Sequence, residues 1–258
     1  MPGVSRCGRP IVPAPDSQQW WSPFCKVNAV TVLHVDLTPH GLREASALSW
    51  LDQDELARSR RFLYPGPSRR FILCRSALRA ILCRQLGFDN RQLTFGESRY
   101  GKPYAMLING RITNSFNVSH SGKHGLIAFA PHGQLGVDVE ERVAREDIDD
   151  LSKLVFGPNE RSALALACGS RKIDLFFKFW TIKEALIKAV GMGFSLDPSS
   201  FEIPSAMYSG TKSRFQFPEM PAQKWQIEYI GNEEFAASVA YEVGCADIYR
   251  HSRENGNP

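Results

Sequence analysis

Two carboxylates lie two residues apart in the segment 135–140, whose sequence is LGVDVE. The alternation of apolar and other residues predicts a β-strand in which Asp138 and Glu140 share one face with Gly136. The carboxylates are then about 7 Å apart at the backbone, and the glycine leaves space beside them. Like charges this close repel unless a cation lies between them, and a few carboxylates completed by water suit Mg²⁺. The pair therefore predicts a magnesium site, although a solvent-facing strand carries the same pattern.

A third carboxylate, Glu184, lies in the segment 174–194, which we predict to be a largely apolar helix. At about 100° per residue, one broad face of this helix collects both apolar and charged side chains. Its members are Phe177, Trp180, Glu184, Ile187 and Lys188. A carboxylate beside apolar surface loses hydration and needs a cation or metal partner, so this face is typical of the wall of a site. The alternative is a solvated pair of Glu184 and Lys188, one turn apart.

Basic residues in the first third of the chain indicate an anion-binding surface. The predicted helices 46–64 and 69–86 carry arginines on both sides of a Pro65-Gly66-Pro67 turn. Arginine presents two parallel donors to phosphate oxygens, so these helices could hold a phosphate, with an ordinary cationic surface as the alternative. Lys102 lies at the tip of a predicted turn. His120 begins a tight polar turn, where a histidine either binds phosphate or caps a strand.

The remaining patterns predict a mixture of helices and strands. Strands are expected at 29–37, 115–119, 125–130, 134–140, 200–203, 225–230 and 235–241, and further helices at 146–154 and 158–167. Residues 1–27 are rich in proline and serine and are expected to be a tail that its aromatic residues could dock on the core. Residues 250–258 are expected to be disordered.

Composition limits the possible functions. The chain has 258 residues, of which 43% are hydrophobic, so a substantial core is expected. Its net charge of +4 is too small to favour duplex nucleic acid as a partner, but it suits an anionic small molecule or an acidic protein. The six cysteines show no metal or disulfide spacing. No membrane-spanning run, secretory signal, G-x-G-x-x-G motif or Walker loop occurs, so a cytoplasmic protein is expected.

Three motifs occur in a fixed order along the chain. They are Asn117-Val118-Ser119-His120-Ser121-Gly122, then Gly136-Val137-Asp138-Val139-Glu140, then Phe176-x-x-x-Trp180-x-x-Lys183-Glu184-Ala185-x-x-Lys188-x-x-Gly191-x-Gly193. Together they resemble the 4′-phosphopantetheinyl transferases, in the long single-chain branch of the Sfp type. The order and spacing agree from near Arg58 through Phe194.

This resemblance implies an activity and a fold. Such enzymes move the phosphopantetheine arm of coenzyme A onto a serine of an acyl or peptidyl carrier protein, with Mg²⁺, and release adenosine 3′,5′-bisphosphate. Their fold is α+β, with two similar α/β halves packed as a pseudo-dimer around the active site. It divides this chain into halves at 28–140 and 141–249. The branch usually acts as a monomer, and its carriers serve fatty acid, polyketide or nonribosomal peptide synthesis.

The resemblance also gives roles to the catalytic residues. Asp138 and Glu140 are expected to bind Mg²⁺, and Glu184 to complete its ligands or act through a water. Glu184 is also the expected base for the serine, directly or through a metal-bound water, because apolar surroundings raise a carboxyl pKa. Lys188 is expected to stabilise the pyrophosphate, and His120 to meet a phosphate of the coenzyme.

Seven side chains are expected to bind coenzyme A. They are Arg58, Arg70, Lys102, Ser119, His120, Lys183 and Lys188. The resemblance places Arg70 with His120 at the 3′-phosphate, Lys102 against the adenine nucleotide and Lys183 near the pyrophosphate. Arg58 takes a place that lysine usually holds in related chains.

Two other classes of function would use the same residues. A Mg²⁺-dependent phosphohydrolase or nucleotidyl transferase also needs the three carboxylates, but it turns over a nucleotide without a protein acceptor. A non-catalytic module that binds coenzyme A and docks a carrier would keep binding after loss of Asp138. A nucleic-acid binder is disfavoured, because the aromatic residues are not interleaved with the arginine clusters.

Overall fold

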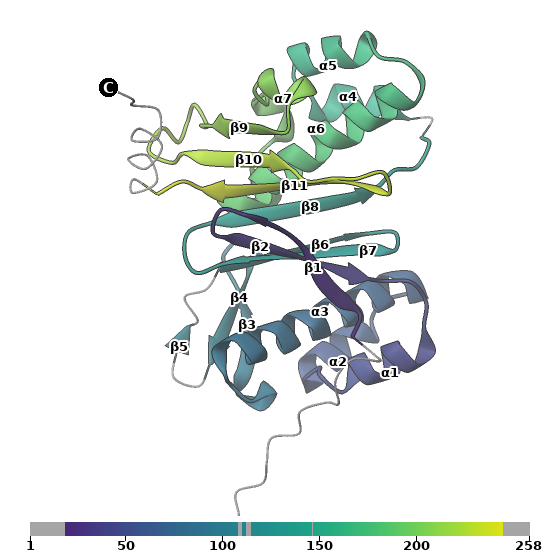
Figure 1. Ribbon diagram of the computed structural model, residues 1–258, viewed down its shortest axis with the longest axis vertical. Coiled ribbons are helices and arrows are strands. Elements are labelled where there is room, and N and C mark those ends of the chain that lie inside the picture. Colours follow the sequence, from purple (N-terminus) through teal and green to yellow (C-terminus); the bar gives the residue numbers. More distant parts are fainter. Residues whose placement is uncertain (1–18, 108–109, 112–114, 146, 245–258) are drawn as a thin grey trace, which may run out of the picture.

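The computed structural model describes residues 19–107, 110–111, 115–145 and 147–244. Within these residues, helices form the two outer layers and two antiparallel sheets lie between them (Figure 1). The predicted disordered tail 250–258 lies outside the described residues, as does the predicted tail up to residue 18.

The first half is built on a sheet with the strand order β1-β2-β7-β6. The strands are β1 (Trp21–Val27), β2 (Val30–Asp36), β7 (His124–Ala130) and β6 (Ser115–Ser121). The long helix α3 (Pro65–Leu86) covers one face; it has proline in its first turn and ends at Gly87, whose φ is 71°. The half is completed by α1 (Gly41–Leu48), α2 (Gln53–Ser59), a 3₁₀ turn at Asn90–Gln92 and a small sheet of β3 (Leu93–Glu97), β4 (Pro103–Leu107) and β5 (Gly110–Arg111).

The second half repeats this plan with the strand order β8-β11-β10-β9. The strands are β8 (Leu135–Glu141), β11 (Phe235–Glu242), β10 (Trp225–Tyr229) and β9 (Lys212–Phe215). The long helix α6 (Gly169–Val190) packs on the outer face of this sheet. It is flanked by α4 (Ile148–Val155), α5 (Pro158–Ala165), α7 (Ala206–Ser209) and 3₁₀ turns at Gly193–Ser195 and Pro198–Ser200.

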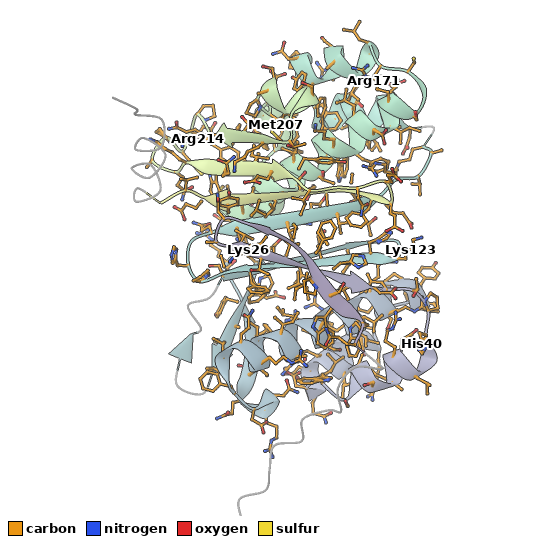
Figure 2. The ribbon with its side chains drawn as sticks, viewed as in Figure 1. Lys26, His40, Lys123, Arg171, Met207 and Arg214 are labelled. Carbon is orange, nitrogen blue, oxygen red and sulfur yellow. The ribbon has the colours of Figure 1, made fainter. Side chains whose placement is uncertain are left out.

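The two sheets face each other across an apolar layer. It is formed by Val30, Val32, Leu126, Ala128, Ala130, Leu135, Val137, Val139, Phe235, Ala237, Val239 and Tyr241. Figure 2 shows side chains filling the space between the sheets and, on the outer side of the second sheet, the core that contains Met207. The edge strands β6 and β8 are tied together because the backbone N–H of Val137 donates to Oδ1 of Asn117 at 2.9 Å. The predicted α+β fold of two packed α/β halves is confirmed.

Most predicted elements are present, and three predictions are wrong. The expected tail includes a strand, because residues 21–27 form β1. The expected helix 46–64 is two helices, since Asp52 and Glu55 form a capping box that starts α2. The expected strand 200–203 is not a strand in the structure. Because β8 pairs with β11, we also propose that the boundary between the halves lies in the loop 131–134, before β8 and not after it.

Candidate active site

The candidate site lies where β6 and β8 meet and α6 crosses β8. As predicted, Asp138 and Glu140 lie on the face of β8 opposite the apolar layer between the sheets. The predicted space beside Gly136 is filled, however. A Cβ atom there would lie 2.1 Å from the carbonyl oxygen of Ala185 and 2.4 Å from the backbone nitrogen of Ala189. The glycine therefore allows the backbone of α6 to approach β8 closely.

Three side chains from three elements form a closed hydrogen-bonded group. Nζ of Lys188 donates to Oδ1 of Asp138 at 2.6 Å and to Oγ of Ser119 at 2.9 Å. Oγ of Ser119 donates to the same Oδ1 at 2.8 Å. Asp138 is 2% exposed, and its Oδ2 is buried without a hydrogen-bond partner among the described residues. A buried oxygen of this kind normally has a partner, so Oδ2 is available to a ligand.

The other two carboxylates, Glu140 and Glu184, are partly buried and lie near the negative charge of Asp138. Oγ of Ser121 donates to Oε2 of Glu140 at 2.6 Å. Burial raises the pKa of Glu140 to about 7, and the charge of Asp138 adds to this effect. Burial, followed by the charge of Asp138, also raises the pKa of Glu184. The three carboxylates therefore act on one another electrostatically, as the sequence predicted, and a cation between them would relieve the repulsion.

The donor chemistry fits a hard divalent cation. All candidate ligands are carboxylate oxygens, one of them buried and unpaired, and their negative charges are close enough to raise pKa values. In the described part of the chain, no three His, Cys, Asp or Glu side chains already form a metal-binding cluster. Asp138 is instead neutralised by Lys188. Binding of Mg²⁺ by Asp138, Glu140 and Glu184 stays a prediction.

Cations lie next to these carboxylates. The pKa of His120 is lowered, first by loss of hydration and then by the positive charges of Arg70 and Lys188, so the three groups share one neighbourhood. Within the described residues Arg70 forms no ion pair. A histidine near two cations, one of them without an ion pair among the described residues, is typical of an anion-binding site.

Comparisons with the sequences of known proteins identify the family. Residues 134–240 match the model of the 4′-phosphopantetheinyl transferase superfamily, and residues 38–132 match that of the 4′-phosphopantetheinyl transferase N-terminal region. The 4′-phosphopantetheinyl transferase HetI of Nostoc is 38% identical over 194 residues, which cover 74% of this chain and 78% of HetI. The chain belongs to the 4′-phosphopantetheinyl transferase family.

Other members of the family match over shorter stretches. A Synechocystis relative is 38% identical over 145 residues, which cover 56% of this chain and 58% of that protein. Sfp of Bacillus subtilis is 29% identical over 156 residues, which cover 60% of this chain and 67% of Sfp. This chain therefore spans less than two thirds of the Synechocystis relative.

Two lysines expected to bind coenzyme A have other partners. Lys183 is fully buried, and its Nζ forms an ion pair with Glu160 at 2.9 Å and donates to the carbonyl oxygens of Pro198 and Phe201. The prediction that Lys183 binds the coenzyme is therefore wrong, because its ammonium has no donor or surface left for a ligand. Nζ of Lys102 donates to two backbone carbonyl oxygens, which occupy two of the three donors of its ammonium. Its contact with the adenine nucleotide stays a prediction.

Arg58 lies at the surface of the protein. Its Nη1 is 3.4 Å from Oε1 of Glu97, its guanidinium lies 5.2 Å from the centre of the Phe71 ring, and its side chain is 55% exposed. An exposed pair of this kind is weak, so Arg58 can exchange Glu97 for a phosphate. Its role in binding the coenzyme stays a prediction.

Sequence reasoning gave no role to Ser121 or Asn117. Ser121 supports Glu140, and Asn117 fixes the backbone of β8 beside Asp138. Both lie in the strand motif Asn117-Val118-Ser119-His120-Ser121, where the alternation of polar residues is the sequence signal that could have placed them on one face.

In the described parts of the chain, no helix is long and apolar enough to span a lipid bilayer.

Proposed function

We propose that the site formed by β6, β8 and α6 is the active site of a 4′-phosphopantetheinyl transferase. This enzyme modifies a serine of an acyl or peptidyl carrier protein. The observation that carries this proposal is the group of Lys188, Asp138 and Ser119, which joins both halves of the fold within the regions that match the family. It puts an ammonium and an unpaired carboxylate oxygen beside a cationic surface, which suits a pyrophosphate and its metal.

The cationic residues bind and orient coenzyme A in this proposal. His120 and Arg70 receive its 3′-phosphate, and Arg58 gives a further phosphate contact at the surface. Lys188 leaves Oδ1 of Asp138 for the pyrophosphate when the coenzyme binds, and Ser119 donates to the same group. Asp138, Glu140 and Glu184 would hold Mg²⁺, which when bound stabilises negative charge on the pyrophosphate oxygens.

The transfer itself is a substitution at phosphorus. The serine oxygen of the carrier forms a bond to the phosphorus that bears the pantetheine arm, and the bond from that phosphorus to the bridging oxygen breaks. Adenosine 3′,5′-bisphosphate leaves with that oxygen, and Lys188 stabilises the charge that develops on it. Glu184 takes the serine proton, because its raised pKa makes it a better base than an ordinary carboxylate. If Glu184→Gln retains wild-type turnover at saturating Mg²⁺, Glu184 is not the base.

The acceptor of the phosphopantetheine is a carrier protein. Carrier proteins of this kind are acidic, and a net charge of +4 favours their approach. We keep the expectation that the enzyme acts as a cytoplasmic monomer.

Mass spectrometry of candidate carriers tests the proposal. The protein is incubated with coenzyme A, Mg²⁺ and apo carriers from fatty acid, polyketide and peptide synthesis. We expect a carrier to gain the mass of phosphopantetheine, and a carrier whose acceptor serine is replaced by alanine to gain none. Hydrolysis of coenzyme A without any carrier modification would instead support a phosphohydrolase. Binding of coenzyme A without turnover would support a non-catalytic module.

A further inference from the structure

Lys102 brings a largely buried ammonium to the junction of the two halves. It follows the turn between β3 and β4, and its Nζ donates to the carbonyl oxygens of Leu135 and Ala189, both at 2.9 Å. One side chain from the first half therefore binds the start of β8 and the last turn of α6. In the part of the chain that the structure describes, no carboxylate forms an ion pair with it.

The end of α6 provides a reason for this cation. The last carbonyl groups of a helix have no partner within the helix, and positive charge is favourable beside them. The side-chain amide of Gln134, with its nitrogen turned towards α6, supplies a second donor to Ala189 at 2.9 Å. The helix stops at Gly191, where φ is 77° and a Cβ atom would lie 3.0 Å from Cδ of Lys102. Gly191 thus leaves room for the lysine stem.

The bonds of Lys102 lie beside the catalytic group. Ala189 follows Lys188 directly, and Leu135 lies three residues before Asp138 on β8. The backbones of α6 and β8 are in contact at Gly136, the residue after Leu135, to which Lys102 is bound. A shift of the last turn of α6 would therefore move Lys188 away from Asp138.

We propose that Lys102 is a positioning residue, which holds the last turn of α6 against β8 so that Lys188 and Glu184 face Asp138. Burial lowers the pKa of Lys102 to about 8, which reflects the cost of removing this ammonium from water. Its effect on turnover rests on the proposed transferase function, whereas its effect on the order of α6 does not.

Lys102→Met tests this role, because methionine keeps most of the stem and removes the ammonium. The matched control is Lys178→Met, on α6 itself, where Nζ donates to the carbonyl oxygen of Gly210 at 2.8 Å and lies 5.1 Å from the centre of the Tyr229 ring. Both changes remove a cation that binds a backbone carbonyl, but only Lys102 lies at the site. Hydrogen–deuterium exchange of the free proteins reports on the peptide 186–192 without any need for activity.

We expect Lys102→Met to increase exchange in the peptide 186–192 at least tenfold, and Lys178→Met to leave it within twofold of wild type. In the carrier assay, Lys102→Met should lower kcat 10- to 100-fold with KM for coenzyme A changed less than threefold, and Lys102→Arg should recover part of kcat. A raised KM with wild-type kcat and wild-type exchange would overturn the proposal and make Lys102 only a coenzyme ligand. If wild type modifies no carrier, the transferase function fails, and unchanged exchange in Lys102→Met is then the separate result that refutes the positioning role.

Discussion

Removing the negative charge of Glu140 should stabilise the metal-free protein. Glu140 lies near Asp138 and Glu184, and burial with the charge of Asp138 raises its pKa from 4.5 to about 7. At pH 8 the carboxyl is ionised in both the folded and the unfolded state. Only in the folded state does its charge cost free energy, because it is partly buried there and lies near Asp138. Each pH unit between the two pKa values represents roughly 1.4 kcal/mol. After reduction for the partial exposure of Glu140, we expect Glu140→Gln to gain about 2 kcal/mol.

The pH dependence of this gain identifies its cause. Below pH 7, folded wild type takes up a proton on Glu140 while the unfolded chain stays ionised until about 4.5, so the cost decreases steadily between these two pH values. The advantage of Glu140→Gln should therefore be largest at pH 8 and small at pH 5. Glutamine still accepts the hydrogen bond from Ser121, so lost bonding does not obscure the comparison.

Urea denaturation with EDTA, followed by tryptophan fluorescence, measures the free energy of unfolding. The control is Glu141→Gln, the next residue on β8, whose carboxylate lies against Gly122. Adding Mg²⁺ should stabilise wild type more than Glu140→Gln, because a ligand that binds the native state raises its stability. No gain at pH 8, or an equal gain at pH 5 and pH 8, would refute the view that crowded carboxylates destabilise the empty site.

Three further changes test the structure around the site. Lys183→Met should cost about 3–5 kcal/mol in urea denaturation because it leaves Glu160 charged and buried, and a loss below 1 kcal/mol would contradict the buried pair. Gly136→Ala should lower the free energy of unfolding by roughly 1–3 kcal/mol and also lower the carrier modification rate, because its Cβ would lie 2.1 Å from a backbone oxygen of α6. Wild-type values of both quantities would show that the backbones of α6 and β8 are not in contact. The rings of His34 and His124 are joined by a 3.0 Å nitrogen–nitrogen contact, and burial lowers the pKa of both. As the pH falls below about 6.5, the unfolded chain therefore takes up protons on these histidines before the folded chain does, and the free energy of unfolding decreases. His124→Gln should flatten this acid loss in denaturation curves at pH 5–7, whereas an unchanged slope would assign the loss to other groups.

Local periodicity predicted much of the site. Alternation along β8 put Asp138 and Glu140 on one face, and the helical period put Glu184 and Lys188 together on another. On the same period Lys183 lies about 100° from Glu184, next to the edge of that face, so the spacing alone did not decide its role. Its partner Glu160 precedes it by 23 residues, on another helix, and no local pattern joins the two.

Other features depended on contacts between distant segments. Strand β1 was not predicted, because Pro23 disfavours a strand and the pairing is irregular between Pro23 and Cys25. Proline is acceptable here because β1 lies at the edge of its sheet. The hydrogen bond from Lys102 to Ala189 joins residues 87 positions apart in the sequence. Sequence reasoning about a turn could therefore only suggest a free cation at its tip. Tertiary packing decided both.

The most direct test of the proposed site is the rate at which Asp138→Asn modifies an apo carrier that wild type converts with coenzyme A and Mg²⁺. Asparagine keeps the shape and the hydrogen bond to Ser119 but removes the charge that faces Lys188 and the cation. We predict that the rate of carrier mass gain, measured by mass spectrometry, falls at least a thousandfold while the variant stays folded. A rate close to that of wild type would contradict the assignment of Asp138 and its neighbours as the active site.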